Sequence, residues 1–215
     1  GLEIGIGLHP AREISGDLYD FFEYSAHEAV IVFGDSSGKG AAAALYGSLV
    51  SGLLRILAPR GKGPSRLMHS LNETLLERKI DAQYVTLLVM LWQAQTRSLT
   101  MANAGALPPL VCRRGELLKP RVEGVPLGLL GDQTYEELYF PAEPGDIIVL
   151  YSDGITDALN ADGEEYGRRR LGSVVVSHCA SAANEIVDAV LADVDTFTTG
   201  AAAFDDQTLI ILKVQ

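Results

Sequence analysis

The chain is organised around one stretch, Ala29-Val-Ile-Val-Phe-Gly-Asp-Ser-Ser-Gly-Lys-Gly40. Its apolar run shows no polar alternation, which is typical of a strand covered on both faces. The run ends on Asp35, and a glycine-rich turn then opens into an alanine-rich helical pattern. A carboxylate at the end of a buried strand costs free energy unless something binds there. We therefore interpret Asp35 as the central ligand of a metal site, on which other acidic motifs converge.

The composition is that of an ordinary globular domain. The chain has 215 residues, of which 47% are hydrophobic and 21% charged, so it can bury a full core. Its net charge of −11 argues against nucleic acid or an anionic membrane surface as the main partner. The same charge would repel an anionic substrate, so bound cations would have to offset it.

The cysteines and the apolar runs indicate a cytoplasmic protein without membrane contact. Cys112 and Cys179 show no metal-binding or redox spacing, which fits free thiols in a reduced compartment. No apolar run approaches the roughly 18 residues that span a bilayer, and no signal peptide precedes the first strand pattern. Because the chain begins inside structured-looking sequence, we expect one domain, 1–215, excised from a longer regulatory protein.

Hydrophobic periodicity predicts strands joined mostly by short turns, together with four helices. Short connections favour antiparallel pairing, and amphipathic helices then cover the sheets, so we expect a layered α+β domain. In the first helix we expect the apolar face to carry Leu45, Leu49, Leu53, Leu54 and Leu57. The predicted helices are 41–57, 65–79, 168–177 and 182–194. The predicted strands are 2–8, 15–24 after its opening turn, 29–33, 84–92, 99–103, 110–113, 116–119, 134–140, 147–151 and 208–214.

Four aspartates stand where strand patterns begin or end. Asp35 and Asp153 follow the ends of apolar strands, and Asp17 and Asp205 precede the starts of others. In an antiparallel sheet the end of one strand lies beside the start of its neighbour, so all four carboxylates could gather at one edge. Clustered carboxylates need cations or protons. Ligation by oxygen alone favours Mg²⁺ or Mn²⁺ over Zn²⁺.

Glycines beside three of these acids support the same interpretation. Gly16, Gly34 and Gly154 would let backbone carbonyls and water approach closely. The simpler alternative is that Asp-Gly and Gly-Asp pairs are only turn residues. The position of all four acids at the ends of the most apolar strands argues against that alternative.

Two other site types fit the acidic motifs less well. A phosphate-binding loop fails because three residues, not the required four, separate Gly34 from Gly38, and because Asp35 would repel a phosphate. An aspartic-protease pair of Asp35 and Asp153, sharing one proton, leaves Asp17 and the pair Asp205-Asp206 without a role.

Seven motifs together resemble a known family. Their order is similar to that of the SpoIIE/RsbU-type branch of the metal-dependent protein phosphatases, the PPM or protein phosphatase 2C superfamily, over nearly the whole chain. This resemblance implies an αββα four-layer sandwich of two antiparallel sheets flanked by helices. The motifs are Gly16-Asp-Leu-Tyr-Asp20, Gly34-Asp-Ser-Ser-Gly-Lys-Gly40, Tyr84-Val-Thr-Leu87, Ala102-Asn-Ala-Gly105, Pro126-Leu-Gly128, Leu150-Tyr-Ser-Asp-Gly-Ile-Thr-Asp157 and Asp205-Asp-Gln-Thr208.

The resemblance also implies a serine/threonine phosphatase with two Mg²⁺ or Mn²⁺ ions. Asp35 would bridge both ions, and Asp17 and the carbonyl of Ser36 would bind one of them. Asp153 and Asp205 would hold the other ion. The implied reaction is in-line attack of a metal-activated water on phosphoserine or phosphothreonine, and the two ions would offset the substrate's charge. The implied metal-site residues are Asp17, Asp35, Ser36, Asp153, Asp205 and Asp206.

Some positions depart from the family pattern. Ser15 and Ser36 stand where a glycine and an aliphatic residue are frequent, and we expect activity to survive both changes. Ala106 replaces a frequent histidine, a change that bears on substrate handling or rate. Lys39 could help to bind anions, although a solvated loop lysine is an equal alternative.

The resemblance implies partners as well. They are a phosphorylated protein substrate, such as an anti-sigma-factor antagonist, and an upstream sensor or regulatory domain, with a homodimer as a further expectation. The helices 41–57 and 65–79 are packing elements, and in the resembled branch they also serve as a regulatory switch. The alternative function is a degenerate phosphatase fold kept as a phosphoprotein-binding scaffold. The intact set of four aspartates argues against it.

Overall fold

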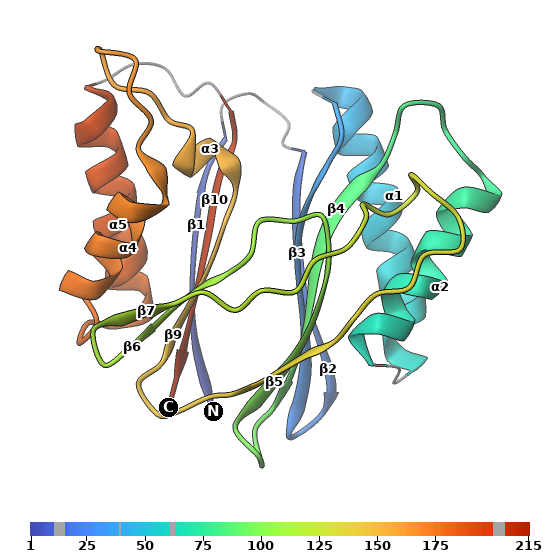
Figure 1. Cartoon of the computed structure of the whole chain (residues 1–215), viewed down its shortest axis with the longest axis horizontal. Helices are drawn as coiled ribbons and strands as arrows, with labels where there is room; N and C mark the ends of the chain where they lie inside the picture. The colour runs from blue at the N-terminus through green and yellow to red at the C-terminus, as the bar shows by residue number, and fades with distance from the viewer. Residues whose placement is uncertain (11–15, 39, 61–62, 200–204) are drawn as a thin grey trace. The chain divides into compact units, whose positions relative to one another are not determined.

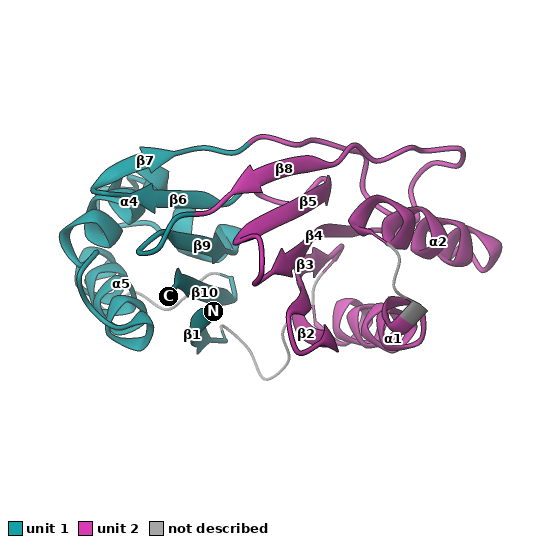
Figure 2. Cartoon of the chain, turned by 90° about the horizontal axis from the view of Figure 1, so that it is seen from below, with its two compact units in different colours: residues 1–13, 109–120, 143–215 teal, residues 14–108, 121–142 magenta. Residues whose placement is uncertain are grey.

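The computed structural model describes residues 1–10, 16–38, 40–60, 63–199 and 205–215 (Figure 1). The chain divides into two compact units, coloured separately in Figure 2. Unit 1 comprises residues 1–13, 109–120 and 143–215, and unit 2 comprises residues 14–108 and 121–142. Each unit contains one five-stranded antiparallel sheet with helices packed against it, so the predicted α+β class is confirmed.

Unit 1 is built on the sheet with strand order β1-β10-β9-β6-β7. One face of this sheet, including Val149 of β9 and Ile211 of β10, packs against α4 and α5 to form a core. The elements are β1 (Leu2–His9), β6 (Leu110–Arg113), β7 (Glu116–Leu118), β9 (Ile147–Tyr151), α3 (Asp153–Thr156), α4 (Gly167–Ser177), α5 (Ala183–Thr198) and β10 (Gln207–Val214).

Unit 2 is built on the sheet with strand order β2-β3-β4-β5-β8. Residues of β3, β4 and β5, such as Val32 and Leu87, pack against α1 and α2 in a second core. The elements are β2 (Asp17–Ser25), β3 (Glu28–Ser36), α1 (Ala41–Leu57), the 3₁₀ turn η1 (Ala58–Arg60), α2 (Pro64–Glu77), β4 (Val85–Gln93), β5 (Ser98–Ala104) and β8 (Leu138–Pro141).

The two strands predicted to be covered on both faces are buried as expected. Every residue of β9 is buried, as is the stretch 30–34 of β3. The hairpin turn predicted at Arg114-Gly115 also forms, with both residues at positive φ. The predicted strand 134–140 is wrong for most of its length, because only Leu138–Pro141 pairs with β5.

The predicted apolar face of α1 is also wrong in part. Leu45 and Leu49 are 72% and 46% exposed, and the helix instead buries a face that includes Ala43, Gly47 and Val50. Apolar residues lie on several sides of α1, and the buried face brings Gly47 to the buried Ser36, where an added Cβ would be in ordinary contact at 3.5 Å from Ser36 Oγ.

Two expectations about thiols and membranes can be compared with the structure. Cys112 is buried and Cys179 is exposed, and neither forms a disulfide. Among the helices within the described ranges, none has both the length and the apolar character needed to cross a bilayer.

Candidate functional site

The first pair of acids is positioned by the pairing of β2 with β3. Asp17 begins β2 and lies directly opposite Asp35 in the antiparallel register, while Asp35 pairs with Thr86 of β4 on its other side. Side chains directly opposite one another share a face, with Cβ atoms about 5 Å apart, and like charges there are destabilising. A cation bound between them would remove that repulsion. The expectation that these two strand ends meet is therefore confirmed.

The structure extends the acid-bearing strand beyond the predicted boundary. We expected Asp35 to follow the strand, but β3 continues through Ser36. The extension arises because Ser36 pairs with Val85 of β4 and its N–H donates to the Gly16 carbonyl at 3.2 Å. Asp35 is thus held on both sides by neighbouring strands, which fixes its backbone.

Two oxygen atoms of β3 approach the Cα of Gly16 closely. A Cβ on Gly16 would lie 2.9 Å from Asp35 Oδ1 and 3.4 Å from the carbonyl oxygen of Ser36. Carboxylate and carbonyl oxygens are the ligands that Mg²⁺ and other hard cations take in proteins. The donor set of unit 2 therefore fits the expected metal, and a side chain at position 16 would crowd it.

Ser36 also fastens this site to α1. Its side chain is buried, and Oγ donates a hydrogen bond to the carbonyl oxygen of Ala43 at 2.7 Å. The Gly16 carbonyl oxygen lies 3.1 Å from the same hydroxyl. One buried serine at the end of β3 thus contacts Gly16, just before β2, and the first turn of α1.

Thr86 is a residue of this site to which the sequence assigned no role. Its Oγ1 donates to the carbonyl oxygen of Asp35 at 3.3 Å. The carbonyl oxygen of Thr86 stands 2.0 Å from where a Cβ on Gly34 would be, so only glycine fits before Asp35. The signal was present in the motif Tyr84-Val-Thr-Leu87, but strand register is not readable from a short motif.

The second group of acids lies in unit 1, where β9, α3 and β10 meet (Figure 1). Ser152 joins the segments, because its Oγ donates to the Asp206 carbonyl oxygen at 2.9 Å and accepts from the Thr208 N–H at 2.9 Å. A Cβ on Gly154 would lie 2.1 Å from that same Asp206 oxygen. The backbones of Asp153-Gly154 and of Asp205-Asp206 are therefore in direct contact. The short helix α3, which begins at Asp153, was not predicted.

The predicted site residues are divided between the two units. Asp17, Asp35 and Ser36 belong to unit 2, whereas Asp153 and the pair Asp205-Asp206 belong to unit 1. Within the part of the chain that the structure describes, no group of three or more His, Cys, Asp and Glu side chains is arranged to hold a metal ion. The gathering of all the carboxylates around two ions stays a prediction. Ser15 and Lys39 lie outside the described residues.

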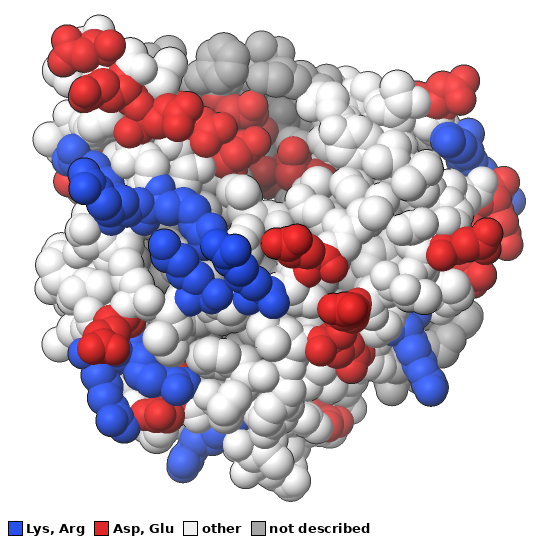
Figure 3. Space-filling view, in the orientation of Figure 1, with Lys and Arg blue, Asp and Glu red and all other residues white. Residues whose placement is uncertain are grey.

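Asp153 lies near other acidic side chains and close in sequence to a buried tyrosine. Acidic side chains gather over the end of unit 1 where α3 lies (Figure 3). Tyr151, two residues before Asp153, is buried, and this burial raises its pKa to about 12. The Arg168 guanidinium carbon lies 5.6 Å from the centre of the Tyr151 ring. The Tyr151 hydroxyl is therefore neutral at physiological pH.

The turn that carries Ala106 is built by Asn103. The Asn103 side-chain amide donates to the Ala106 carbonyl oxygen at 2.9 Å and accepts from the Ala106 N–H at 2.8 Å. Gly105 between them has a φ of +77°, and a Cβ there would stand 2.7 Å from Pro126. The backbone of this motif is thus held by Asn103 and Gly105, independently of the residue at position 106.

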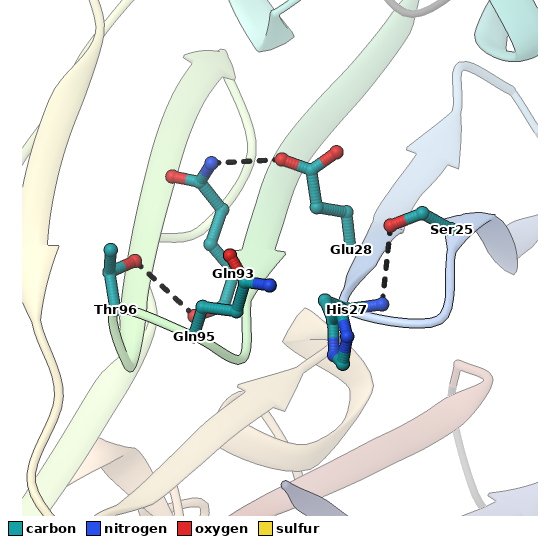
Figure 4. Close-up of a pocket in the computed structure, with 6 residues that line it drawn as sticks. All are labelled: Ser25, His27, Glu28, Gln93, Gln95 and Thr96. Atoms are coloured by element: carbon teal, nitrogen blue, oxygen red, sulfur yellow. Dashed lines mark hydrogen bonds between the residues drawn. The ribbon is translucent and has the colours of Figure 1, made fainter.

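A polar hollow of about 300 Å³ lies at the other end of the unit 2 sheet (Figure 4). Gln93 Nε2 donates to Glu28 Oε1 at 2.9 Å within it. Glu28 begins β3 and Asp35 is seven residues further along, so about 24 Å separates them. The hollow is therefore distinct from the candidate metal site. It is lined by Ser25, His27, Glu28, Gln93, Gln95 and Thr96.

Comparison with known proteins identifies the family. The sequence pattern of the family described as "Stage II sporulation protein E (SpoIIE)" matches residues 25–215. Phosphoserine phosphatase RsbU of Bacillus subtilis is 30% identical, over 99% of this chain and 63% of RsbU. The chain spans between 24% and 63% of the length of the curated relatives that it matches.

Solved structures show the same fold. The PP2C phosphatase domain of SpoIIE from Bacillus subtilis, solved with a fragment of its regulatory domain, gives a TM-score of 0.87 at 21% identity, covering all of this chain and 63% of that one. RsbX, solved in complex with magnesium, gives a TM-score of 0.72 at 16% identity, covering all of this chain and 96% of that one. The chain therefore has the fold of PP2C phosphatase domains and belongs to the SpoIIE family.

Proposed function

We propose that this chain is a metal-dependent protein phosphatase domain that hydrolyses phosphoserine or phosphothreonine. The observation that carries the proposal is the pair of opposed carboxylates, Asp17 and Asp35, with Asp35 Oδ1 close to Gly16. Membership of the SpoIIE family and the name of the relative RsbU, a phosphoserine phosphatase, support it.

The residues proposed to hold two Mg²⁺ or Mn²⁺ ions come from both units. Asp35 is the proposed bridge, with Asp17 and the Ser36 carbonyl on one ion and Asp153 and Asp205 on the other. Asp206 is a further candidate beside them. Such ions supply a nucleophilic water at neutral pH and offset the phosphoryl charge. The crystal structure of RsbX in complex with magnesium supports the choice of a divalent ion.

The protein's own contribution is rigid placement of its oxygen atoms. Asp35 is fixed between two strands, and Ser36 is fixed by its bond to α1. Asp205 accepts a hydrogen bond from the Asp206 N–H at 3.0 Å, which orients its carboxylate. Preorganised oxygens do not have to be reordered during the reaction, and this lowers the barrier.

The proposed substrate is a phosphorylated anti-sigma-factor antagonist or a similar signalling protein in the cytoplasm. The resemblance of the ordered motifs to the SpoIIE/RsbU branch supports this choice. We further propose that the domain acts under an upstream regulatory domain, which the greater length of its relatives supports. The alternative function is a phosphoprotein-binding scaffold without catalysis.

The test is hydrolysis of p-nitrophenyl phosphate and of a phosphoserine protein, each with Mn²⁺ and with EDTA. We expect Mn²⁺-dependent turnover that falls by about 10³-fold or more in Asp35→Asn. Asp188→Asn, at an exposed acid on α5, is the matched control and should retain full turnover. Calorimetry should find two Mn²⁺ ions per chain, and fewer in Asp35→Asn.

Three outcomes would count against this function. Undiminished turnover in Asp35→Asn would exclude the proposed site. Binding of the phosphoprotein without any metal-dependent turnover would favour the scaffold. Cleavage of peptides at acid pH would revive the aspartic-protease alternative.

A further inference from the structure

Two loops of unit 2 expose large apolar side chains near the acid-bearing end of β3. Ile80 and Tyr84, between α2 and β4, are 50% and 36% exposed. Leu129 and Leu130, in the segment after Pro126, are 41% and 52% exposed. We call these four side chains the apolar ridge. Both loops run beside α2 in Figure 1, and Figure 3 shows acidic and basic side chains bordering an uncharged area in that part of the face.

The two loops are joined to each other. Val85 and Leu127 form an isolated antiparallel bridge, with N–H to carbonyl distances of 3.0 and 2.9 Å. A Cβ on Gly128, the residue before Leu129, would lie 3.8 Å from the Gln83 carbonyl oxygen. Tyr84 and Leu129 therefore come from adjacent backbone segments.

The ridge is also joined to the strand that carries Asp35. Ser37, two residues after Asp35, donates its N–H to the Tyr84 carbonyl oxygen at 2.9 Å. The Ser37 hydroxyl accepts from the Tyr84 N–H at 2.8 Å. Tyr84 stands two residues from Thr86, the partner of Asp35, which corresponds to about 7 Å along the strand.

Buried hydrogen bonds make the ridge a rigid feature. Asn72 of α2 is 1% exposed, and its side chain donates to the Leu130 carbonyl oxygen at 3.0 Å. The same side chain accepts from the Gly128 N–H at 2.8 Å. Exposed apolar side chains on a fixed backbone can bind a partner without a large loss of conformational entropy.

Charges around the ridge are mixed. Arg78 and Lys79 precede Ile80 and are exposed, but Asp81 and Asp132 are exposed in the same two loops. A partner of one strong charge is therefore not favoured at the ridge. A partner with an apolar protein surface is favoured, because exposed apolar groups on a rigid backbone mark protein interaction sites.

We propose that the apolar ridge docks the folded protein whose phosphoserine is hydrolysed. This proposal rests on the phosphatase function proposed above. A serine side chain is short, so the surface of a folded substrate must come close to the acids that act on its phosphate. A standard interface buries about 800 Å² on each partner, a disc of about 16 Å radius, which would reach Tyr84 from Asp35. Tyr84 supplies an apolar anchor of the ridge within that area.

The test compares three substrates in the ridge variants Tyr84→Ala and Leu130→Ser. The substrates are a folded, phosphorylated anti-sigma-factor antagonist, a phosphoserine peptide of about ten residues from it, and p-nitrophenyl phosphate. We expect kcat/KM for the folded protein to fall at least tenfold, mainly through KM. Turnover of p-nitrophenyl phosphate should stay within twofold, because no ridge side chain belongs to the candidate metal site.

Tyr139→Ala is the matched control, because Tyr139 is an exposed aromatic residue, on β8, outside the ridge. It should leave all three substrates unaffected. Thermal unfolding of each variant checks that the fold is retained, and Leu130→Ala replaces Leu130→Ser if the latter unfolds.

The outcomes separate this proposal from the phosphatase function. If the ridge variants lose turnover of both the folded protein and p-nitrophenyl phosphate, or of neither, the docking role is wrong. It is also wrong if the unsubstituted chain hydrolyses p-nitrophenyl phosphate but not the folded protein. A change in oligomeric mass in Tyr84→Ala would assign the ridge to a second copy of the chain instead. Absence of metal-dependent turnover of any substrate would overturn the phosphatase function itself.

Discussion

The hydroxyl group of Ser36 donates a hydrogen bond to the carbonyl oxygen of Ala43 at 2.7 Å. This contact joins the strand that carries Asp35 directly to the first turn of α1. Gly47 of α1 lies against the same serine. The position of α1 and the position of the Ser36 carbonyl are therefore coupled through one buried side chain.

Ser36→Ala should lower the free energy of unfolding by about 1–2 kcal/mol, because it removes a buried hydrogen bond. Ser48→Ala is the matched control. The Ser48 hydroxyl donates to the Ala44 carbonyl oxygen at 2.8 Å, but at the exposed face of α1, so its loss should be about 0.5 kcal/mol or less. Urea denaturation measures both values. Equal losses in the two variants would contradict the role given to Ser36.

Gly34→Ala should destabilise the chain by about 3 kcal/mol or more. The added Cβ would stand 2.0 Å from the Thr86 carbonyl oxygen, and a backbone atom within a paired strand cannot move away easily. Gly52→Ala in α1 is the contrasting control. A Cβ there meets nothing within 4 Å, so a gain of about 0.5–1 kcal/mol is expected from helix propensity. A Tm for Gly34→Ala equal to that of the unsubstituted chain would refute the close approach.

Asp146→Asn tests the ion pair that fastens the start of β9 in unit 1. Asp146 is 1% exposed and accepts two bonds from Arg113, at 2.9 and 2.6 Å, and one from the Glu143 N–H at 2.9 Å. Loss of the buried charge removes the stronger of the two carboxylate partners of Arg113 and leaves it the more exposed Glu143, at 3.2 Å, so we expect a loss of about 2–4 kcal/mol in urea denaturation. Arg114→Ala, which breaks an exposed pair with Glu143, should change stability by about 1 kcal/mol or less. A larger loss of stability in Arg114→Ala than in Asp146→Asn would show that burial does not decide how much each ion pair contributes.

Alkaline unfolding should report on the buried tyrosines of both units, among them Tyr135 of unit 2 and Tyr151 of unit 1. Burial raises the pKa of Tyr135 and of Tyr151 from 10.0 to about 12. Since these pKa values are higher in the folded chain, the unfolded chain loses its protons first. The stabilising contribution is full below pH 10 and is lost as the pH rises towards 12. The free energy of unfolding should therefore fall across this interval.

Tyr135→Phe should reduce the fall in the free energy of unfolding as the pH rises from 10 towards 12. It should also leave stability at pH 7 unchanged or raised by up to about 1 kcal/mol, because the buried Tyr135 hydroxyl has no hydrogen-bond partner among the described residues. Urea denaturation at a series of pH values measures both effects, with Tyr139→Phe, at an exposed tyrosine, as the control. If the free energy of unfolding of Tyr135→Phe falls with pH as steeply as that of the unsubstituted chain, the Tyr135 hydroxyl is not buried in solution.

Much of the local structure could be predicted because it depends on the periodicity of residues that are close together in the sequence. Helix α1 begins and ends where its helical spacing predicts, and β9 forms over the whole predicted run. The strand predicted over 134–140 failed because alternation alone does not supply a neighbour with which to pair, and only Leu138–Pro141 finds one. The buried face of α1 was mispredicted because apolar residues surround that helix on several sides.

The amino-acid sequence by itself determined the order of strands and helices, the acidic ends of the apolar strands and the glycines beside them. These features depend on residues close together in the chain, whose periodicity and conformational limits are local. Only the tertiary structure decided that Asp17 lies opposite Asp35, that Thr86 crowds Gly34, and that Tyr84 stands two residues from the partner of Asp35. Those relationships depend on strand register between distant segments, which the packing of a whole core selects and no short motif encodes.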